Sequence, residues 1–164
     1  MESNLPSPYE CEDDGDGYHF VNKHGVRYHI YFIDKSGLHP KFDNVYSFNI
    51  EPEGSEEETR HPIDNQIAST IVAILSRFFQ KNENAMLMVC DTLDGKEQKR
   101  RKLFDRWFAA YNHNLLIKLD ASLDADEYVI LASIYFRHDN PNRRDLEDAF
   151  NELINTEDVD ELAF

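Results

Sequence analysis

Strict alternation of apolar residues is the feature that most constrains the fold of this chain. Every second residue from Val26 to Phe32 is apolar, which is the period of a half-buried strand. A short apolar segment at 18–21 precedes this run, and the turn residues 22–25 lie between the two. The pattern predicts a β-hairpin, followed by a third strand over 46–50 that Pro52 ends.

Beyond Asp64 the apolar period changes from two to three or four residues. The helical positions are Ile67, Ile71, Ile74, Leu75 and Phe78. They predict a helix over 64–82, with the Asp64 carboxylate as its N-cap.

The rest of the chain continues to alternate between strands and helices. Strands are predicted over 85–90, 115–119 and 128–136, and helices over 96–111 and 143–154. The order is β-β-β-α-β-α-β-β-α. Because adjacent strands in the sequence favour antiparallel pairing, we predict an α+β fold with a mostly antiparallel sheet of about six strands and two to three helices.

Acidic residues are concentrated at the two ends of the chain. The net charge is -15, and residues 2–16 contain six acidic residues but no lysine or arginine. From Asp145 onward there are eight acidic residues and again no basic one. We expect a flexible acidic tail over 1–16, a single α+β domain over 17–155 and an acidic C-terminal tail over 156–164.

The composition also indicates a compartment. No apolar run approaches the roughly 20 residues that span a bilayer, and the chain does not open on a basic and then apolar leader. Two cysteines at this spacing do not indicate a disulfide framework. We therefore expect a cytoplasmic protein with no membrane partner. The net charge disfavours nucleic acid, because an acidic surface repels phosphates.

The most distinctive segment follows the predicted strand at 85–90. Asp91 and Asp94-Gly95 form a predicted turn, and six basic residues lie between Lys96 and Arg106. A strand, a glycine turn and a helix start expose unpaired amides that suit an anion. The alternative is a plain turn followed by a solvated helix face. Lys99, Lys102 and Arg106 share one face of that helix, whereas Arg101 lies nearer the apolar residues and could pair inward with Asp91 or Asp94.

This segment also carries a resemblance. Its pattern CDxxDG…RxLFxRWF, together with the later RxDNP at 137–141, resembles a family of small uncharacterised proteins of Bacteroidota. The similarity covers roughly residues 18–150. The family has no assigned activity, so the resemblance implies a grouping and no mechanism.

A second group of polar residues surrounds Pro141. Arg137, Asp139 and Asn140 come at the end of a predicted strand, just before a helix. If the strand that ends at Arg137 ran parallel to the one that ends at Asp91, these side chains would meet at one end of the domain. The alternative is a turn in which Asp139 caps the following helix.

No residue pattern identifies a metal or nucleophile site. His19 and His29 are expected to be cross-strand neighbours in the hairpin, but no third ligand is evident, so we expect no metal and no cofactor. Cys90 follows an apolar run and is expected to be a buried structural residue. Trp107 is expected in the core, at the helical spacing of Leu103, Phe104 and Tyr111.

Two functions remain open. The first is a non-enzymatic binding or regulatory protein with a protein partner, comparable to an inhibitor, antitoxin or immunity protein. The second is a small-molecule or nucleotide-handling enzyme that uses Asp91, Asp94, Arg101, Arg106 and Arg137. The candidate ligand-binding or partner-binding residues are Asp91, Asp94, Lys99, Arg101, Lys102, Arg106, Arg137, Asp139 and Asn140.

Overall fold

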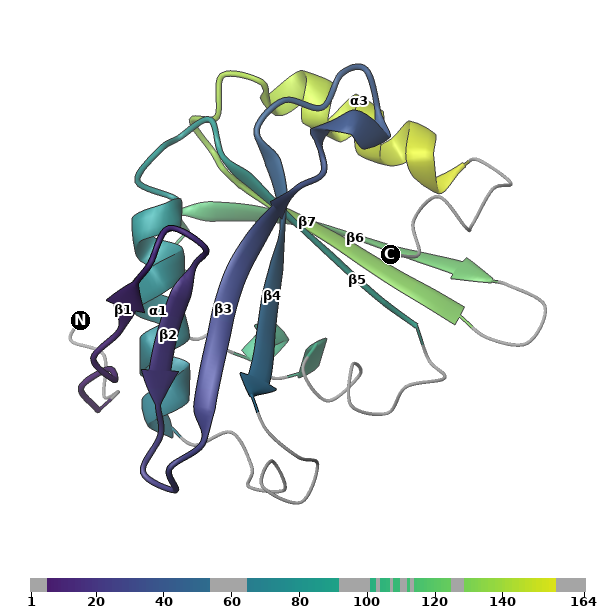
Figure 1. Ribbon diagram of the computed structural model, residues 1–164. Helices are drawn as coiled ribbons and strands as arrows, with labels where there is room; N and C mark the ends of the chain where they lie inside the picture. The colour runs from purple at the N-terminus through teal and green to yellow at the C-terminus, as the bar shows by residue number, and fades with distance from the viewer. Residues whose placement is uncertain are drawn as a thin grey trace. The chain divides into compact units, whose positions relative to one another are not determined.

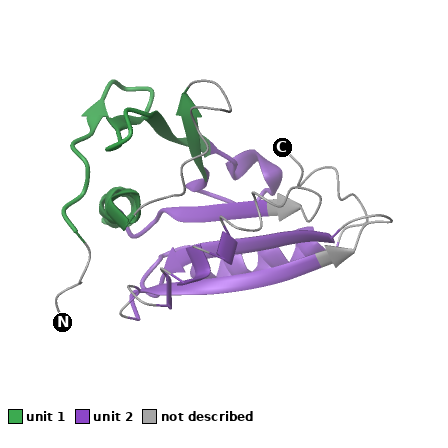
Figure 2. Cartoon of the chain, turned by 90° about the horizontal axis from the view of Figure 1, so that it is seen from below, with its two compact units in different colours: residues 1–33, 48–80 green, residues 34–47, 81–164 purple. Residues whose placement is uncertain are grey.

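A computed structural model describes most of the chain (Figure 1). The described residues are 6–53, 65–91, 101–102, 104–106, 108–109, 112, 114–124 and 129–155. They divide into two compact units, coloured in Figure 2, where the sequence indicated one domain. Unit 1 comprises residues 1–33 and 48–80, and unit 2 comprises residues 34–47 and 81–164.

Seven strands form the sheet, in the order β1-β2-β3-β4-β5-β7-β6. Their bounds are β1 Glu12–Asp13, β2 Tyr18–Val21, β3 Arg27–Asp34, β4 Val45–Glu53, β5 Ala85–Asp91, β6 Leu116–Asp124 and β7 Val129–Arg137. The helices are η1 Ser36–Leu38, α1 Asn65–Phe78 and α3 Arg143–Ile154. This α+β fold confirms the predicted class and the predicted order of strands and helices. Pairing is mostly antiparallel, with β4 and β5 parallel.

Unit 1 contains the predicted hairpin. The side chain of Asn22 accepts hydrogen bonds from the amides of His24 and Val26, and Gly25 takes a positive φ of 80°, so the chain reverses tightly between β2 and β3. Helix α1 buries Ile67, Ile71 and Ile74, as its spacing predicted. At the end of the helix, the rings of Phe78 and Phe32 stack with centroids 4.4 Å apart.

The prediction that structure begins near Gly17 is wrong. Tyr9 stacks on Phe20 at 5.4 Å, and its backbone N–H donates to Thr70 Oγ1 at 2.8 Å. Strand β1 then pairs with β2. Residues 2–16 have no apolar periodicity, so no local pattern revealed these contacts, and Thr70 is distant in the sequence.

Strand β4 also runs further than predicted. It continues through Pro52 to Glu53, because the fixed φ of proline is compatible with extended backbone. The extension has a consequence for the chemistry, since it carries the Glu53 carboxylate to the histidines of the hairpin.

Unit 2 is built around β7, which is covered on both faces. On one face α3 packs Leu146, Ala149, Phe150 and Leu153 against a core that includes Leu87, Ile134 and Phe136. On the other face lies the helical segment 101–109, by which we mean its described residues 101, 102, 104–106, 108 and 109. Phe104 of this segment is buried, and Phe108 meets Tyr135 edge-on at 5.4 Å.

Several expectations lie outside the described residues. They are the Asp64 cap, the side chains of Cys90 and Asp91, Asp94, Lys99, Leu103, Trp107, Tyr111 and the tail at 156–164. Within the described part of the chain, every helix is too short or too polar to cross a membrane.

Candidate functional site

The helical segment 101–109 sorts its basic residues between two sides. Arg101 lies inward, with 13% of its side chain exposed, whereas Lys102 and Arg106 are exposed. The last two are four residues apart and therefore lie on one helix face. The sequence offered Asp91 or Asp94 as an inward partner of Arg101, but Asp94 and the side chain of Asp91 lie outside the described residues. Among the described residues, Arg101 contacts Asp105 and Asp120.

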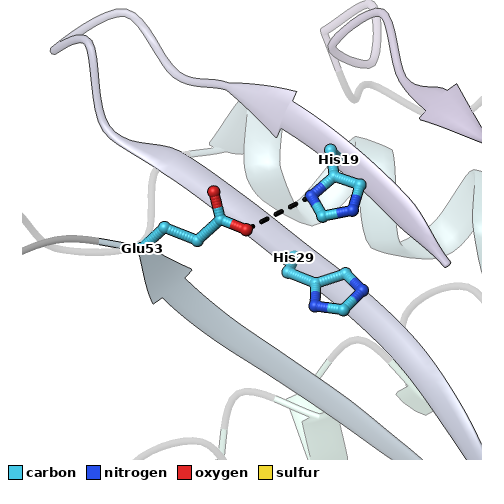
Figure 3. Close-up of side chains that lie close together, drawn as sticks. All are labelled: His19, His29 and Glu53. Atoms are coloured by element: carbon cyan, nitrogen blue, oxygen red, sulfur yellow. Dashed lines mark ion pairs between the residues drawn. The ribbon is translucent and has the colours of Figure 1, made fainter. Parts of the chain in front are cut away.

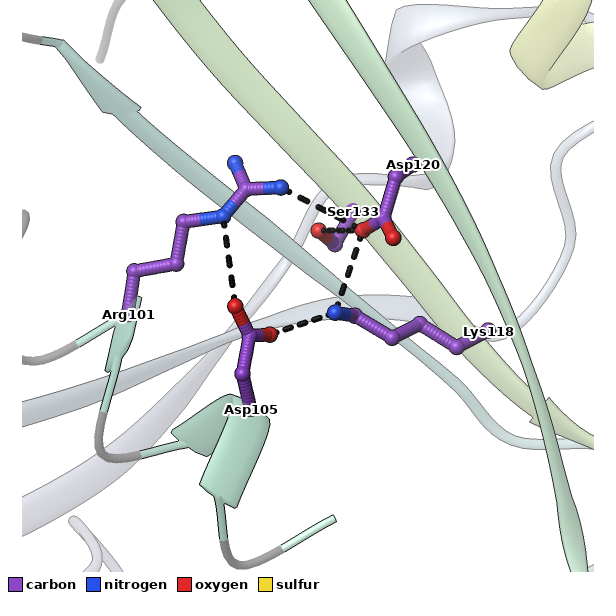
Figure 4. Close-up of polar contacts among 5 residues, drawn as sticks. All are labelled: Arg101, Asp105, Lys118, Asp120 and Ser133. Atoms are coloured by element: carbon purple, nitrogen blue, oxygen red, sulfur yellow. Dashed lines mark hydrogen bonds and ion pairs between the residues drawn. The ribbon is translucent and has the colours of Figure 1, made fainter. Parts of the chain in front are cut away.

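Arg101 belongs to what we call the ionic cluster, which comprises Arg101, Asp105, Lys118, Asp120 and Ser133 (Figure 4). Arg101 Nη2 and Lys118 Nζ each lie 3.3 Å from Asp120 Oδ1. Lys118 also pairs with Asp105, and Arg101 Nε lies 3.9 Å from Asp105 Oδ2. Two cations and two carboxylates thus neutralise one another.

Strand register explains why the ionic cluster forms. Asp120 on β6 faces Ser133 on β7, and the Ser133 hydroxyl donates to Asp120 Oδ1 at 2.5 Å. Lys118 faces Tyr135 two pairs further along, with its ammonium 5.8 Å from the centre of the ring. Alternate residues of a strand share a face, so these groups all point toward the helical segment 101–109.

Tyr135 is buried beside the ionic cluster, where its ring contacts Lys118 and Phe108. Its hydroxyl finds no hydrogen-bond partner in the described part of the chain. Burial, reinforced by the negative charges of Asp105 and Asp120, raises the pKa of the phenol well above its usual range. The hydroxyl therefore stays protonated at neutral pH, because burial and the two carboxylates outweigh the opposing effects of Arg101 and Ser133.

The residues around Pro141 form a turn. Arg137 donates from Nε to Asp139 Oδ1 at 2.8 Å and from Nη2 to Oδ2 at 3.1 Å. This bidentate contact lowers the pKa of Asp139. Buried Asn140 donates to the Asn84 carbonyl and accepts from the backbone of Asn142. These contacts fit the turn alternative, although Asp139 contacts Arg137 and does not cap the helix.

The two candidate groups lie at opposite ends of β7. Strand β5 pairs with β7 antiparallel, so Asp91 lies opposite Ile130 at the start of β7. Arg137 lies at the other end, opposite Leu116. At about 3.3 Å per residue, this separation is roughly 20 Å along the strand. The parallel arrangement that would have brought Asp91 and Arg137 together is therefore wrong.

A further group of polar residues lies within unit 1. We call it the histidine cluster, and it comprises His19, His29 and Glu53 (Figure 3). His19 and His29 are directly opposed across β2 and β3, as predicted, and their rings stack 4.2 Å apart at 7°. One ligand atom from each of the three residues lies within 4.8 Å of the others. Glu53 is thus the third potential ligand that the sequence did not reveal.

The Nε2 atom of each histidine contacts an oxygen atom of a residue outside this cluster. His19 Nε2 lies 2.8 Å from Asp14 Oδ2, and His29 Nε2 lies 3.1 Å from the Asp16 carbonyl oxygen. The backbone N–H of Asp16 donates to Asp14 Oδ1. This hydrogen bond is the main reason why the pKa of the Asp14 carboxyl is lowered. An ionised carboxylate and a carbonyl are acceptors only, so both Nε2 atoms are the protonated ring nitrogens.

The sequence analysis did not identify Lys118, Asp120 or Ser133 in the ionic cluster, nor Glu53 in the histidine cluster. Ser133 becomes a neighbour of Asp120 only through the register of β6 and β7. Lys118 lay in the predicted strand 115–119, but Asp120 lies one residue beyond its predicted end, in the part of β6 that the sequence did not reveal. Glu53 lies beyond the predicted end of its strand, and no local pattern pointed to it.

The chain was compared with known proteins. The model of a family of unknown function, DUF6169, matches residues 63–152, which is more than half of the chain. The chain belongs to this family. No curated protein and no solved structure matches. The matched residues run from just before α1 to near the end of α3, so they include the ionic cluster and exclude His19, His29 and Glu53.

Proposed function

We propose that this DUF6169 member is a non-enzymatic binding or regulatory protein that acts through a protein partner. The observation that carries the proposal is the sorting of basic residues on the helical segment 101–109. Lys102 and Arg106 are exposed on one face, while Arg101 is occupied by Asp105 and Asp120. This exposed basic pair suits an acidic patch on another protein, where charge complementarity sets orientation and association rate.

The enzyme alternative finds less support in the geometry. Its cations would have to bind an anionic substrate, but Arg101 and Arg137 are each paired with carboxylates of the chain. Arg137 and Asp91 also belong to opposite ends of β7. A substrate would have to displace these internal partners before it could be held.

The overall charge supports the same class of partner. The net charge of -15 disfavours nucleic acid and leaves the basic pair as a local exception on an acidic chain. By analogy, inhibitors, antitoxins and immunity proteins use charged surfaces in this way. We further propose a bacterial and cytoplasmic setting, for which the free Cys11 thiol is suitable.

The proposal is tested by charge reversal. The full chain carrying Lys102→Glu and Arg106→Glu is expressed in the native host, cross-linked, and compared with wild type by mass spectrometry. A control chain carries Lys81→Glu and Arg144→Glu, two exposed positions with the same change in net charge. We expect one partner to be captured by wild type and control, and lost from the Lys102 and Arg106 variant. Equal capture by all three chains would contradict the proposed site.

A further inference from the structure

Separately from any protein partner, we propose that the histidine cluster binds a divalent transition-metal ion of the zinc class. The ligands are Nδ1 of His19, Nδ1 of His29 and a carboxylate oxygen of Glu53. All three residues belong to unit 1, and each comes from a different strand, β2, β3 and β4.

The state of the two imidazoles is the first argument. Because Asp14 and the Asp16 carbonyl accept from the Nε2 atoms, Nδ1 is the nitrogen of each ring that is left to bind a metal. Histidines that bind metals are commonly held in this way, with the second ring nitrogen donating to a carboxylate or a backbone carbonyl. Both kinds of acceptor are already in place here.

The unsatisfied nitrogen of His19 is the second argument. The residue is 9% exposed, and its Nδ1 has no hydrogen-bond partner in the described part of the chain. Glu53 Oε1 lies 3.4 Å from this nitrogen, but the contact does not have the geometry of a hydrogen bond. A buried lone pair facing a carboxylate is unfavourable alone, and a cation between them would satisfy both groups.

The spacing is suitable for an ion. Bonds of about 2.0–2.2 Å in a tetrahedral site separate ligand atoms by roughly 3.4 Å. The distance from His19 Nδ1 to Glu53 Oε1 matches this value, and the whole set lies within 4.8 Å. Coordination requires the two stacked rings to tilt so that their lone pairs converge. Three protein ligands leave a fourth position for water.

The supporting contacts extend beyond Asp14 and Asp16. Arg27 Nε lies 3.0 Å from Glu53 Oε2, which directs the other carboxylate oxygen toward His19. Gly17 allows residues 14–17 to pass close to β3, because a Cβ there would lie 2.3 Å from the Ile30 carbonyl oxygen. Its φ of 137° is likewise suited to glycine.

The donor set selects the class of ion. Two imidazole nitrogens and one carboxylate oxygen suit Zn²⁺ and its transition-metal neighbours, whereas Ca²⁺ and Mg²⁺ prefer oxygen ligands. Zn²⁺ is therefore the probe, and Ca²⁺ is the comparison ion.

Calorimetry on the full chain without an affinity tag tests the proposal. After chelator treatment, the wild type is titrated with Zn²⁺ and with Ca²⁺. We expect one Zn²⁺ site per chain, and weakening by more than about 100-fold in His29→Asn and in Glu53→Gln. Asp14→Ala, which removes the acceptor of His19, should weaken it by about 10–100-fold. The control variants His138→Asn and Asp43→Asn alter exposed groups of unit 2, outside this cluster, and should bind as wild type does.

A second measurement on the unmodified chain keeps the test independent of variant folding. Imidazole ¹⁵N signals are followed as Zn²⁺ is added, and those of His19 and His29 should move first and together. Movement of other histidines alone, equal affinity in His29→Asn, or no Zn²⁺ binding at all would overturn the proposal. In that case, His19 would be only an ion-paired side chain between Asp14 and Glu53.

Discussion

The ionic cluster of unit 2 and the histidine cluster of unit 1 use similar groups to different ends. In the ionic cluster, each carboxylate meets both cations, and the two signs cancel. In the histidine cluster, Glu53 faces an imidazole nitrogen that has no hydrogen-bond partner among the described residues. Each charge of the ionic cluster is thus balanced within that cluster. In the histidine cluster, by contrast, Nδ1 of His19 has no hydrogen-bond partner among the described residues.

The difference suggests what each cluster is for. A satisfied set of charges ties the helical segment 101–109 to β6, while Lys102 and Arg106 are exposed on the outer face of that segment. A buried polar group without a hydrogen-bond partner costs stability, and it is retained most readily where a bound ligand or ion satisfies it.

The largest expected effect comes from matched carboxylate-to-amide changes in the two clusters. Asp120→Asn leaves Lys118 and Arg101 facing a neutral amide while both remain mostly buried, and should lower the free energy of unfolding by about 2 kcal/mol. Glu53→Gln should cost about 0.5 kcal/mol, because Arg27 is half-exposed and water can replace the lost charge. Urea denaturation of both variants measures the two costs, and equal costs would break the comparison.

A truncation that starts at Gly17 should have the next largest effect. It removes the Tyr9 ring from Phe20, strand β1, and the acceptors of His19 and His29. We expect a loss of about 1–2 kcal/mol in unfolding free energy, measured by thermal melting with Tyr9→Ala as the partial control. An unchanged melting temperature would restore the expectation of a flexible tail.

Tyr135→Phe tests whether the ionic cluster is complete without the phenol. Removing a buried hydroxyl that has no partner should change stability at neutral pH by less than about 1 kcal/mol, and can increase it. Because the folded pKa of Tyr135 is raised, its contribution is present below the unfolded value of about 10 and is lost as pH rises above that value. Alkaline unfolding of the variant should therefore begin at a higher pH than in wild type.

The smallest effects are expected on the outward face of the helical segment 101–109. Lys102→Ser and Arg106→Ser should each alter the unfolding free energy by no more than about 0.5 kcal/mol, because both side chains are exposed. Arg101→Ala should cost more than either, since it leaves Asp105 and Asp120 with one cation. Chemical denaturation of the three variants measures these costs and tests whether Arg101 lies inward and Lys102 and Arg106 lie outward. A smaller loss of unfolding free energy in the Arg101 variant than in the other two would contradict this placement.

Local periodicity was sufficient to predict most of the fold. The hairpin formed as expected because alternating residues and a turn that runs from Asn22 to Gly25 act over a few positions. Helix α3 has its predicted bounds, since its apolar positions repeat at helical spacing. The extension of β4 and the packing of Tyr9 were not predictable, because both depend on contacts with distant parts of the chain.

The candidate sites were predicted less completely for the same reason. His19 and His29 could be paired from the hairpin pattern, yet Glu53 arrives from a third strand. Arg101 was expected to turn inward, and its contact to Asp105 is a pair four residues apart on one helix. Its contact to Asp120 depends on where β6 lies, which no local pattern gives. A sequence gives the residue types of a cluster, whereas strand register decides which of them meet.

The protonation of the imidazole nitrogens tests most directly whether the histidine cluster is open. A long-range ¹H–¹⁵N correlation spectrum of the metal-free protein is recorded at about pH 8, where an ordinary histidine is neutral. Our account predicts that His19 and His29 both carry their proton on Nε2 and have an unprotonated Nδ1. A proton on Nδ1 of His19, donated to Glu53, would contradict it, because the histidine cluster would then be as complete as the ionic one.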